Sequence, residues 1–254
     1  MPNGKWTESS EEVIQNLLQT HFPGCVVVNK DTSHMDNIPQ RIRWIPSYSW
    51  EIAKSLITEY RIKWAFESMA PYKSPGEDGI LPALVQHGMQ YAVTPICKLY
   101  RASLATGYIP LSWRIARVSF IPKPGRLDYT NSKAFRPISL TSFLLKGLEK
   151  LVDRYLRSET LVDLLLHPRQ HVYQAGKSTE SALYQLVERV ERALEAKQYS
   201  LGVFFDTEGA FDHTSTTVVR KALEERKVVR PVIEWIVAMI GQRLYMHHKE
   251  LLSE

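Results

Sequence analysis

The amino-acid sequence predicts an α+β protein that is rich in helices and has a small antiparallel sheet. Two patterns carry this prediction. Apolar residues recur three and four positions apart in several segments, as at Ile62, Ala65 and Phe66, and this is the period of a helix with one buried face. Between residues 116 and 120, apolar and polar residues alternate instead, which is the period of a half-buried strand.

The first two predicted helices are separated by a long connector. Ser9 and Glu12 form a capping box for a helix through His21. Residues 24–47 show no strong period and are interpreted as the connector. The helix that contains Ile62 is expected to end near Ala70.

The middle of the chain is predicted to form a loop, a helix and a hairpin. Proline and glycine mark the segment Pro71–Gly79 as a loop. Pro95 suits the first turn of the next helix, and Gly107 suits its stop. The alternating strand follows, a turn lies at Pro122–Gly125, and a return strand leads to Leu140.

Further helices and one more strand are expected in the rest of the chain. They are a helix capped by Thr141 and continuing to Tyr155, a helix after Ser178, a strand at Leu201–Phe205, and helices from about Ser215 and about Pro231.

Length and composition favour a globular protein. The chain has 254 residues, enough for one large domain or two small ones with a proper core, and 44% of them are hydrophobic. Cys25 and Cys97 have no metal or disulfide spacing, which favours a reducing compartment. The polar N-terminus excludes a signal peptide, and no apolar run reaches the roughly 20 residues of a membrane span. We therefore expect an intracellular protein of the nucleus or cytoplasm that binds no membrane.

The positive charge is concentrated in one segment. Residues 101–154 contain ten lysines and arginines against three acids, a net charge of +7 in a chain whose total is +5. Clustered positive charge is typical of proteins that bind polyanions such as nucleic acids. A solvated face whose charges are evened out by folding would give the same count.

The segment LGVFFDTEGAFD, residues 201–212, indicates phosphoryl-transfer chemistry. Asp206 ends the apolar run, and a carboxylate at the tip of a buried strand is costly unless a cation lies beside it. Mg²⁺ prefers such oxygen ligands and often shares them with substrate phosphates. An ordinary strand end with a solvated aspartate gives the same pattern, so this segment alone leaves both interpretations open.

The predicted hairpin carries the complementary charges. Lys123 lies at its turn and Arg136 on the return strand. A lysine provides a compact charge and an arginine a planar fork, so together they could clamp a triphosphate. Taken separately, both would be unremarkable surface residues.

Five short motifs follow one another in a fixed order along the chain. Together they resemble the reverse transcriptases of non-LTR (LINE-type) retrotransposons over about residues 73–213. The motifs are KSPGEDGI (73–80), FIPKPG (120–125), FRPISL (135–140), QHVYQAGKSTESAL (170–183) and FFDTEGAFD (204–212).

The resemblance implies a right-hand polymerase fold with fingers and an incomplete palm. Residues 1–47 would be a connector upstream of the polymerase domain, residues 48–200 a fingers-like region, and residues 201–254 a partial palm. The implied partners are an RNA template, a DNA primer and deoxynucleoside triphosphates, and the implied cofactor is Mg²⁺, two ions in the intact family.

The resemblance also implies roles for individual residues. Asp206 would be the first catalytic aspartate and a ligand of both metal ions, and the carbonyl of Thr207 would complete the coordination of one ion. The remaining implied nucleotide contacts are the phosphate-binding side chains of Lys123 and Arg136, the amides of Gly209 and Ala210 next to the triphosphate, and the ring of Phe211 under the sugar.

The sequence also departs from the family pattern. It contains no Asp-Asp dipeptide and no Pro-Gln-Gly motif. Removing one member of a catalytic unit usually abolishes most of the rate. We therefore predict that this polypeptide has no polymerase activity by itself. A non-catalytic nucleic-acid-binding or regulatory protein is the alternative, and a group II intron maturase is a related one.

Two other motifs are weak. Gly176 and Lys177 look like the end of a phosphate-binding P-loop, but the required first glycine is replaced by His171. His167 and His171 have the spacing of helical zinc ligands, but Pro168 interrupts such a helix.

Overall fold

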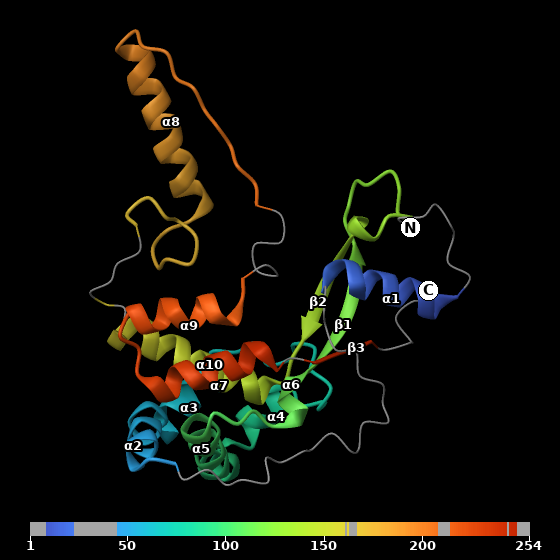
Figure 1. The fold of residues 1–254 in the computed structure, drawn as a ribbon, viewed down its shortest axis with the longest axis vertical. Coiled ribbons are helices and arrows are strands. Elements are labelled where there is room, and N and C mark those ends of the chain that lie inside the picture. The colour runs from blue at the N-terminus through green and yellow to red at the C-terminus, as the bar shows by residue number, and fades with distance from the viewer. Residues whose placement is uncertain are drawn as a thin grey trace.

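The computed structural model describes residues 9–22, 45–160, 162, 167–207, 214–242 and 244–247 of the chain. Helices form most of it, and a small sheet lies beside the main group of helices (Figure 1). The predicted α+β class is confirmed. The helices are α1 (Ser10–His21), α2 (Ser47–Leu56), α3 (Glu59–Glu67), α4 (Pro82–His87), α5 (Met89–Thr106), α6 (Leu111–Arg114), α7 (Phe143–Tyr155), α8 (Thr179–Glu195), α9 (Thr216–Glu225) and α10 (Arg230–Gly241), with a 3₁₀ turn η1 (Ser132–Ala134) and a π-helical turn η2 (Leu156–Thr160).

The sheet has three strands in the order β2-β1-β3. They are β1 (Ile115–Pro122), β2 (Phe135–Leu140) and β3 (Leu244–His247). The predicted hairpin is the antiparallel pair β1–β2, in which Pro122 lies opposite Phe135. Because β3 joins the other side of β1 in parallel, the sheet is mixed. The sequence did not indicate β3, since four residues are too short to show a period.

The main core lies where α3, α5, α7 and α10 meet. Phe66, Tyr100 and Trp235 are its largest fully buried side chains. The Tyr100 hydroxyl donates a hydrogen bond to the carbonyl of Leu144 at 2.5 Å, and the Trp235 indole N–H donates to the Ser103 hydroxyl at 3.0 Å. Burial raises the pKa of Tyr100, so its hydroxyl keeps the proton that it donates. Both buried polar groups are thereby satisfied.

Gly147 lets α7 approach α3 and α5 closely. A Cβ atom at this position would lie 2.4 Å from the Tyr100 hydroxyl oxygen and 3.0 Å from the Phe66 ring. Both distances are shorter than ordinary van der Waals contact. The hydrogen of glycine therefore permits the packing of two of the largest core side chains against α7.

A second, smaller core joins α1 to the sheet. Ile14 and Leu18 pack against Val118 of β1, and all three are buried. Beside them the rings of Phe22 and Tyr245 stack with their centroids 4.3 Å apart. In Figure 1, α1 crosses the strands. Ser9 accepts a hydrogen bond from the backbone of Glu12 at 3.2 Å, which confirms the predicted N-cap.

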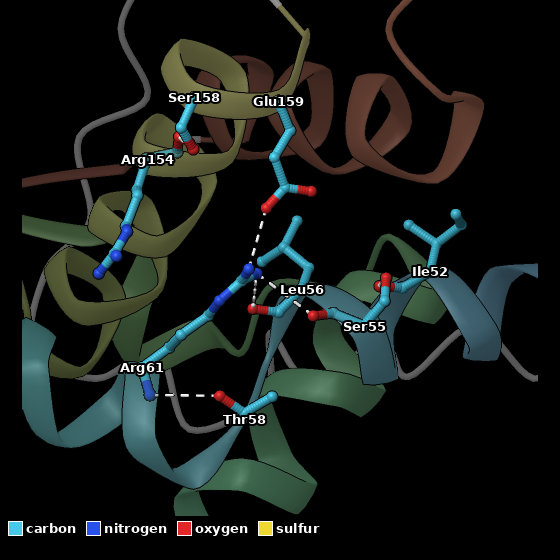
Figure 2. A network of polar contacts seen from close by, with 8 residues as sticks. All are labelled: Ile52, Ser55, Leu56, Thr58, Arg61, Arg154, Ser158 and Glu159. Atoms are coloured by element: carbon cyan, nitrogen blue, oxygen red, sulfur yellow. Dashed lines mark hydrogen bonds and ion pairs between the residues drawn. The ribbon is translucent and has the colours of Figure 1, made fainter.

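Arg61 connects the start of α3 to the end of α2 and to η2 (Figure 2). Its guanidinium donates hydrogen bonds to the carbonyls of Ser55 and Leu56, at 3.2 and 3.1 Å, at the end of α2. The same group pairs with Glu159 of η2 at 2.9 Å. The backbone N–H of Arg61 bonds the hydroxyl of Thr58, the N-cap of α3. One side chain thus joins three helical elements.

Two predicted helix starts were wrong. α5 begins at Met89, so Pro95 lies inside the helix. Proline lacks an N–H, which leaves the carbonyl of Tyr91 without its helical partner, but the burial of Met89 and Val93 keeps the first turns in place. The N-cap of α7 is Ser142 and not the predicted Thr141. The Ser142 hydroxyl accepts a hydrogen bond from the backbone N–H of Leu144 at 3.1 Å. The helices predicted after Ser178 and from about Ser215 are α8 and α9, and the structure shows Ser178 and Ser215 as their N-caps.

The predicted strand Leu201–Phe205 was wrong as well. Residues 201–207 have no regular secondary structure and are exposed, with Leu201 and Phe205 both at 92%. A strand needs a neighbour to take up its N–H and C=O groups. Within the described residues no strand pairs with this segment, so its apolar sequence alone does not produce one.

α8 stands apart from the other helices in Figure 1. Its apolar face is uncovered: Leu183, Leu186, Val187, Val190 and Leu194 are all exposed, and no residue of α8 is buried. Among the described residues, no helix is long and apolar enough to cross a membrane.

Candidate functional site

The tip of the β1–β2 hairpin is closed by hydrogen bonds around Lys123. The backbone N–H of Lys123 donates to the Ala134 carbonyl at 2.8 Å and so continues the ladder beyond β1. Its ammonium donates to the carbonyl of Lys133 at 2.7 Å, and the Tyr129 hydroxyl donates to the carbonyl of Lys123 at 2.9 Å. The positive φ of Gly125, 76°, allows the chain to turn. Residues 123–134 therefore form an ordered loop.

Lys123 and Arg136 lie on the same face of the hairpin. Arg136 is paired with Ile121 across the ladder, and Lys123 follows Ile121 by two residues, which returns a side chain to the same face. Arg136 is exposed, whereas Lys123 is half-buried because its ammonium reaches back to the loop. The register of the hairpin thus places the two residues that are predicted to contact phosphate on one face.

An open hollow of about 540 Å³ lies inside the loop. Its lining residues are Gly125, Arg126, Leu127, Asp128, Asn131, Lys133 and Ala134. Hydrogen bonds from Thr130, including one from its backbone N–H at 2.8 Å, lower the pKa of Asp128, so this wall carries one carboxylate beside the two cations Arg126 and Lys133. These two cations were not predicted from the sequence as part of a site. Nothing in the local pattern marked them, because only the loop conformation places them on one wall.

The loop Lys73–Ile80, which holds the first motif, packs on the start of α7. A Cβ atom on Gly76 would lie 2.7 Å from the backbone nitrogen of Ser142, so glycine is required for this contact. One oxygen of Asp78 accepts from the backbone of Ile80 at 3.2 Å, and the other is buried without a hydrogen-bond partner. The buried Nε atom of Arg117 on β1 also lacks one. The first motif therefore packs on the residues that directly follow the third motif, where β2 leads into α7.

Asp206 and Thr207 lie in the exposed segment 201–207. Within the described part of the chain, the structure joins Asp206 to neither Lys123 nor Arg136 by an ion pair or hydrogen bond. The other predicted contacts to the nucleotide, Gly209, Ala210 and Phe211, lie outside the described residues.

The described residues do not make up a two-metal site. Asp206 supplies one carboxylate, and no group of three or more His, Cys, Asp or Glu side chains that could hold a metal ion occurs among the residues described. Two-metal catalysis needs ligands that hold both ions about 4 Å apart.

The loop before α8 is held by side-chain contacts. Lys177 donates to the carbonyls of Pro168 and Gln170, the second at 3.0 Å. The imidazole of His171 contacts the Ser181 hydroxyl at 2.9 Å and Gln185 at 3.2 Å. These groups, which resembled parts of a P-loop and a zinc site, connect the loop to itself and to α8.

Comparison with known protein families identifies the class of the chain. Residues 121–252, about half of it, match the family model described as reverse transcriptase (RNA-dependent DNA polymerase). The match begins in the second motif at the end of β1 and includes the third, fourth and fifth motifs. The chain therefore belongs to the reverse transcriptase family, whose members are generally metal-dependent.

Relatives among curated proteins come from transposable elements. The chain is 26% identical over 224 residues to the Pol polyprotein of the type-1 retrotransposable element R1 from Bradysia coprophila, covering 88% of this chain and 21% of the relative. It is 25% identical over 219 residues to the RNA-directed DNA polymerase of the mobile element jockey from Drosophila melanogaster, covering 83% of this chain and 23% of the relative. A probable RNA-directed DNA polymerase from transposon BS of the same fly is 30% identical over 148 residues, or 58% of this chain and 16% of the relative.

These relatives confirm the resemblance to the reverse transcriptases of non-LTR retrotransposons. The chain spans 16 to 23% of the length of the three relatives. The chain therefore aligns with only a part of each of these relatives.

Proposed function

We propose that the chain is the fingers region and the beginning of the palm of an RNA-directed DNA polymerase of a non-LTR retrotransposon. Residues 48–200 serve as the fingers-like region, residues 201–254 as the partial palm, and residues 1–47 as the connector before them. The observation that carries the proposal is the ordered β1–β2 hairpin, which contains the second and third motifs and has Lys123 and Arg136 on one face. Its partners are an RNA template, a DNA primer and deoxynucleoside triphosphates.

Each residue is assigned a role suited to its chemistry. Lys123 and Arg136 hold the triphosphate by charge-assisted hydrogen bonds. In the assembled palm, Asp206 and the carbonyl of Thr207 are ligands for two Mg²⁺ ions. The amides of Gly209 and Ala210 meet the phosphates, and Phe211 lies under the sugar as a flat wall with few rotamers to order.

A nucleotide-binding measurement tests the role of the hairpin. Titrating a fluorescent deoxyadenosine triphosphate analogue into the chain should show binding that the double variant Lys123→Gln, Arg136→Gln weakens about tenfold or more, since each hydrogen bond to a charged group is worth roughly 1.5 kcal/mol or more. The control Lys54→Gln, Lys98→Gln removes two exposed charges from α2 and α5 and should bind like the wild type. Equal affinities for the two double variants would contradict the assignment.

We also propose that this polypeptide does not extend a primer by itself, because its sequence has no adjacent aspartate pair. A primer-extension assay on an RNA template with Mg²⁺ should give no incorporation above the background of the Asp206→Ala variant. Incorporation that Asp206→Ala abolishes would show that the proposal is wrong and that Asp206 is catalytic.

A non-catalytic nucleic-acid-binding protein is the second candidate function. The missing aspartate pair favours it, and the net charge of +7 within residues 101–154 supports binding of nucleic acid in either case. An Asp-Asp strand in frame downstream of codon 254 would identify a polymerase, whereas the binding protein predicts an affinity for RNA or an RNA–DNA hybrid that falls as salt rises. Affinity that is unchanged between low and high salt would contradict the binding protein.

A further inference from the structure

A row of three cations runs along one side of α7. Lys146, Lys150 and Arg154 follow one another at four-residue intervals, so they lie one above the other, about 6 Å apart along the helix axis. Arg154 is exposed, and Lys146 and Lys150 are half-buried. We call these three residues the α7 ridge. It lies on the body of helices and is separate in sequence from the hairpin.

Aromatic rings hold the cations of the ridge in place. The ammonium of Lys146 lies 4.3 Å from the centroid of the Phe143 ring. The Trp64 ring of α3 lies 4.4 Å from the Arg154 guanidinium carbon and 5.6 Å from the ammonium of Lys150. A ring face attracts a cation without neutralising its charge. The ridge is therefore both charged and partly ordered before any ligand arrives.

Two of the acids near the ridge, Asp153 and Glu159, are paired with arginines outside it, while Glu149 lies within the ridge segment, next to Lys150. Asp153 binds Arg157 through both carboxylate oxygens, at 2.8 and 2.9 Å. Glu159 binds Arg61 at 2.9 Å, and Figure 2 shows the Arg154 side chain extending away from Glu159. Among the described residues, no carboxylate forms an ion pair with Lys150 or Arg154 within 4.0 Å.

A row of cations on an aromatic support is suited to a linear polyanion. Successive turns of one helix present positive charges at a regular interval, as the phosphates of a nucleic-acid strand present negative ones. Binding would release counterions from the strand, which favours association at low salt.

We propose that the α7 ridge binds the phosphate backbone of a nucleic-acid strand. The proposal deepens the proposed function and rests on it, because it assumes that the chain binds nucleic acid. It assigns to Lys146, Lys150 and Arg154 a contact with backbone phosphates that carries no sequence preference.

The test measures the affinity of a fluorescein-labelled single-stranded RNA by anisotropy over a range of salt concentrations. For the variant Lys150→Gln, Arg154→Gln we expect weaker binding on RNAs of different sequence. The slope of log K against log salt should become shallower by about 1.4, since each phosphate contact to a single strand contributes about 0.7. The single variant Arg154→Gln, at an exposed position, should show about half of this change in slope.

Matched variants separate charge from structure. Lys150→Arg, Arg154→Lys keeps both charges and should bind RNA like the wild type. Lys54→Gln, Lys98→Gln removes the same charge elsewhere and should change the salt slope less than the ridge variant. Thermal melts of all variants show whether they are folded.

Each outcome has a distinct meaning. If the wild-type chain does not bind RNA, the proposed function and the ridge both fail. If it binds and the ridge variant matches the Lys54 and Lys98 control, the ridge proposal alone is wrong. If poly-glutamate or phosphatidylserine vesicles bind as tightly as RNA and lose the same affinity in the ridge variant, the assignment to nucleic acid is wrong.

Discussion

Because Gly147 has a hydrogen in place of a side chain, α7 can approach the centre of the core closely. Replacing it with alanine would put a methyl group 2.4 Å from the Tyr100 hydroxyl oxygen, which is itself bonded to the carbonyl of Leu144. Overpacking of a close-packed core typically costs 1–3 kcal/mol. We therefore expect Gly147→Ala to lower the free energy of unfolding by roughly 2 kcal/mol in urea titrations.

Gly241 at the end of α10 supplies the control. A Cβ atom there would lie 3.6 Å from the side chain of Thr216, an ordinary contact, and alanine favours helix over glycine by up to about 1 kcal/mol. Gly241→Ala should therefore unfold at the same urea concentration as the wild type or a higher one. If Gly147→Ala behaves in the same way, the core does not pack as described.

At the scale of elements, α9 and α10 are joined by the pair Arg220–Glu234. The guanidinium binds both carboxylate oxygens, at 2.7 and 2.8 Å. The hydrogen bond from Arg220 lowers the pKa of Glu234 below its ordinary 4.5. The stabilisation is therefore complete above the ordinary pKa and is lost as the pH falls through the lowered value. Both side chains are partly exposed, so we expect no more than about 1 kcal/mol.

The measurement compares wild type with Glu234→Gln from neutral pH to below pH 4. The wild type should be more stable near neutrality, and the difference should disappear at the acid end. Glu225→Gln is the control, because Glu225 lies 4.0 Å from Lys221 in an exposed pair and should contribute nothing measurable. A difference for Glu234→Gln that persists at acid pH would contradict the pairing.

The exposed apolar face of α8 gives a second prediction for an element. Because Leu186 and Val190 are not buried, changing both to serine should alter the free energy of unfolding by no more than about 0.5 kcal/mol each. Leu148 of α7 is fully buried, and Leu148→Ala should cost about 2–5 kcal/mol. Loss of stability in the serine variant equal to that of Leu148→Ala would show that α8 is covered in solution.

At the scale of the whole molecule, structural features that depend on neighbouring residues could be predicted from the sequence. Pairings between segments far apart in the chain could not. The hairpin followed from alternation and turn residues, and the cap Ser9 from residue type and position. α2 was missed because Ser49 is among its buried positions, so its apolar face is faint.

Some residues of the candidate site could likewise be predicted from the sequence, and others could not. Lys123 and Arg136 could be found because they belong to motifs next to a turn, whereas the cations of the hollow come together only through the loop conformation. Asp206 was expected at the tip of a strand, and the strand did not form because its apolar residues have no described strand to pair with. The roles of all these residues remain predictions.

β3 brings residues 244–247 into the sheet beside β1, more than 120 positions earlier in the chain. During synthesis on the ribosome, β1 and β2 can pair as soon as both have emerged, but the other edge of β1 then stays open until residues 244–247 have also emerged. Such non-local pairing forms late, and an open edge invites association with other nascent chains. The interval before β3 arrives is therefore the period in which translation speed and chaperones have the greatest influence on the yield of folded protein.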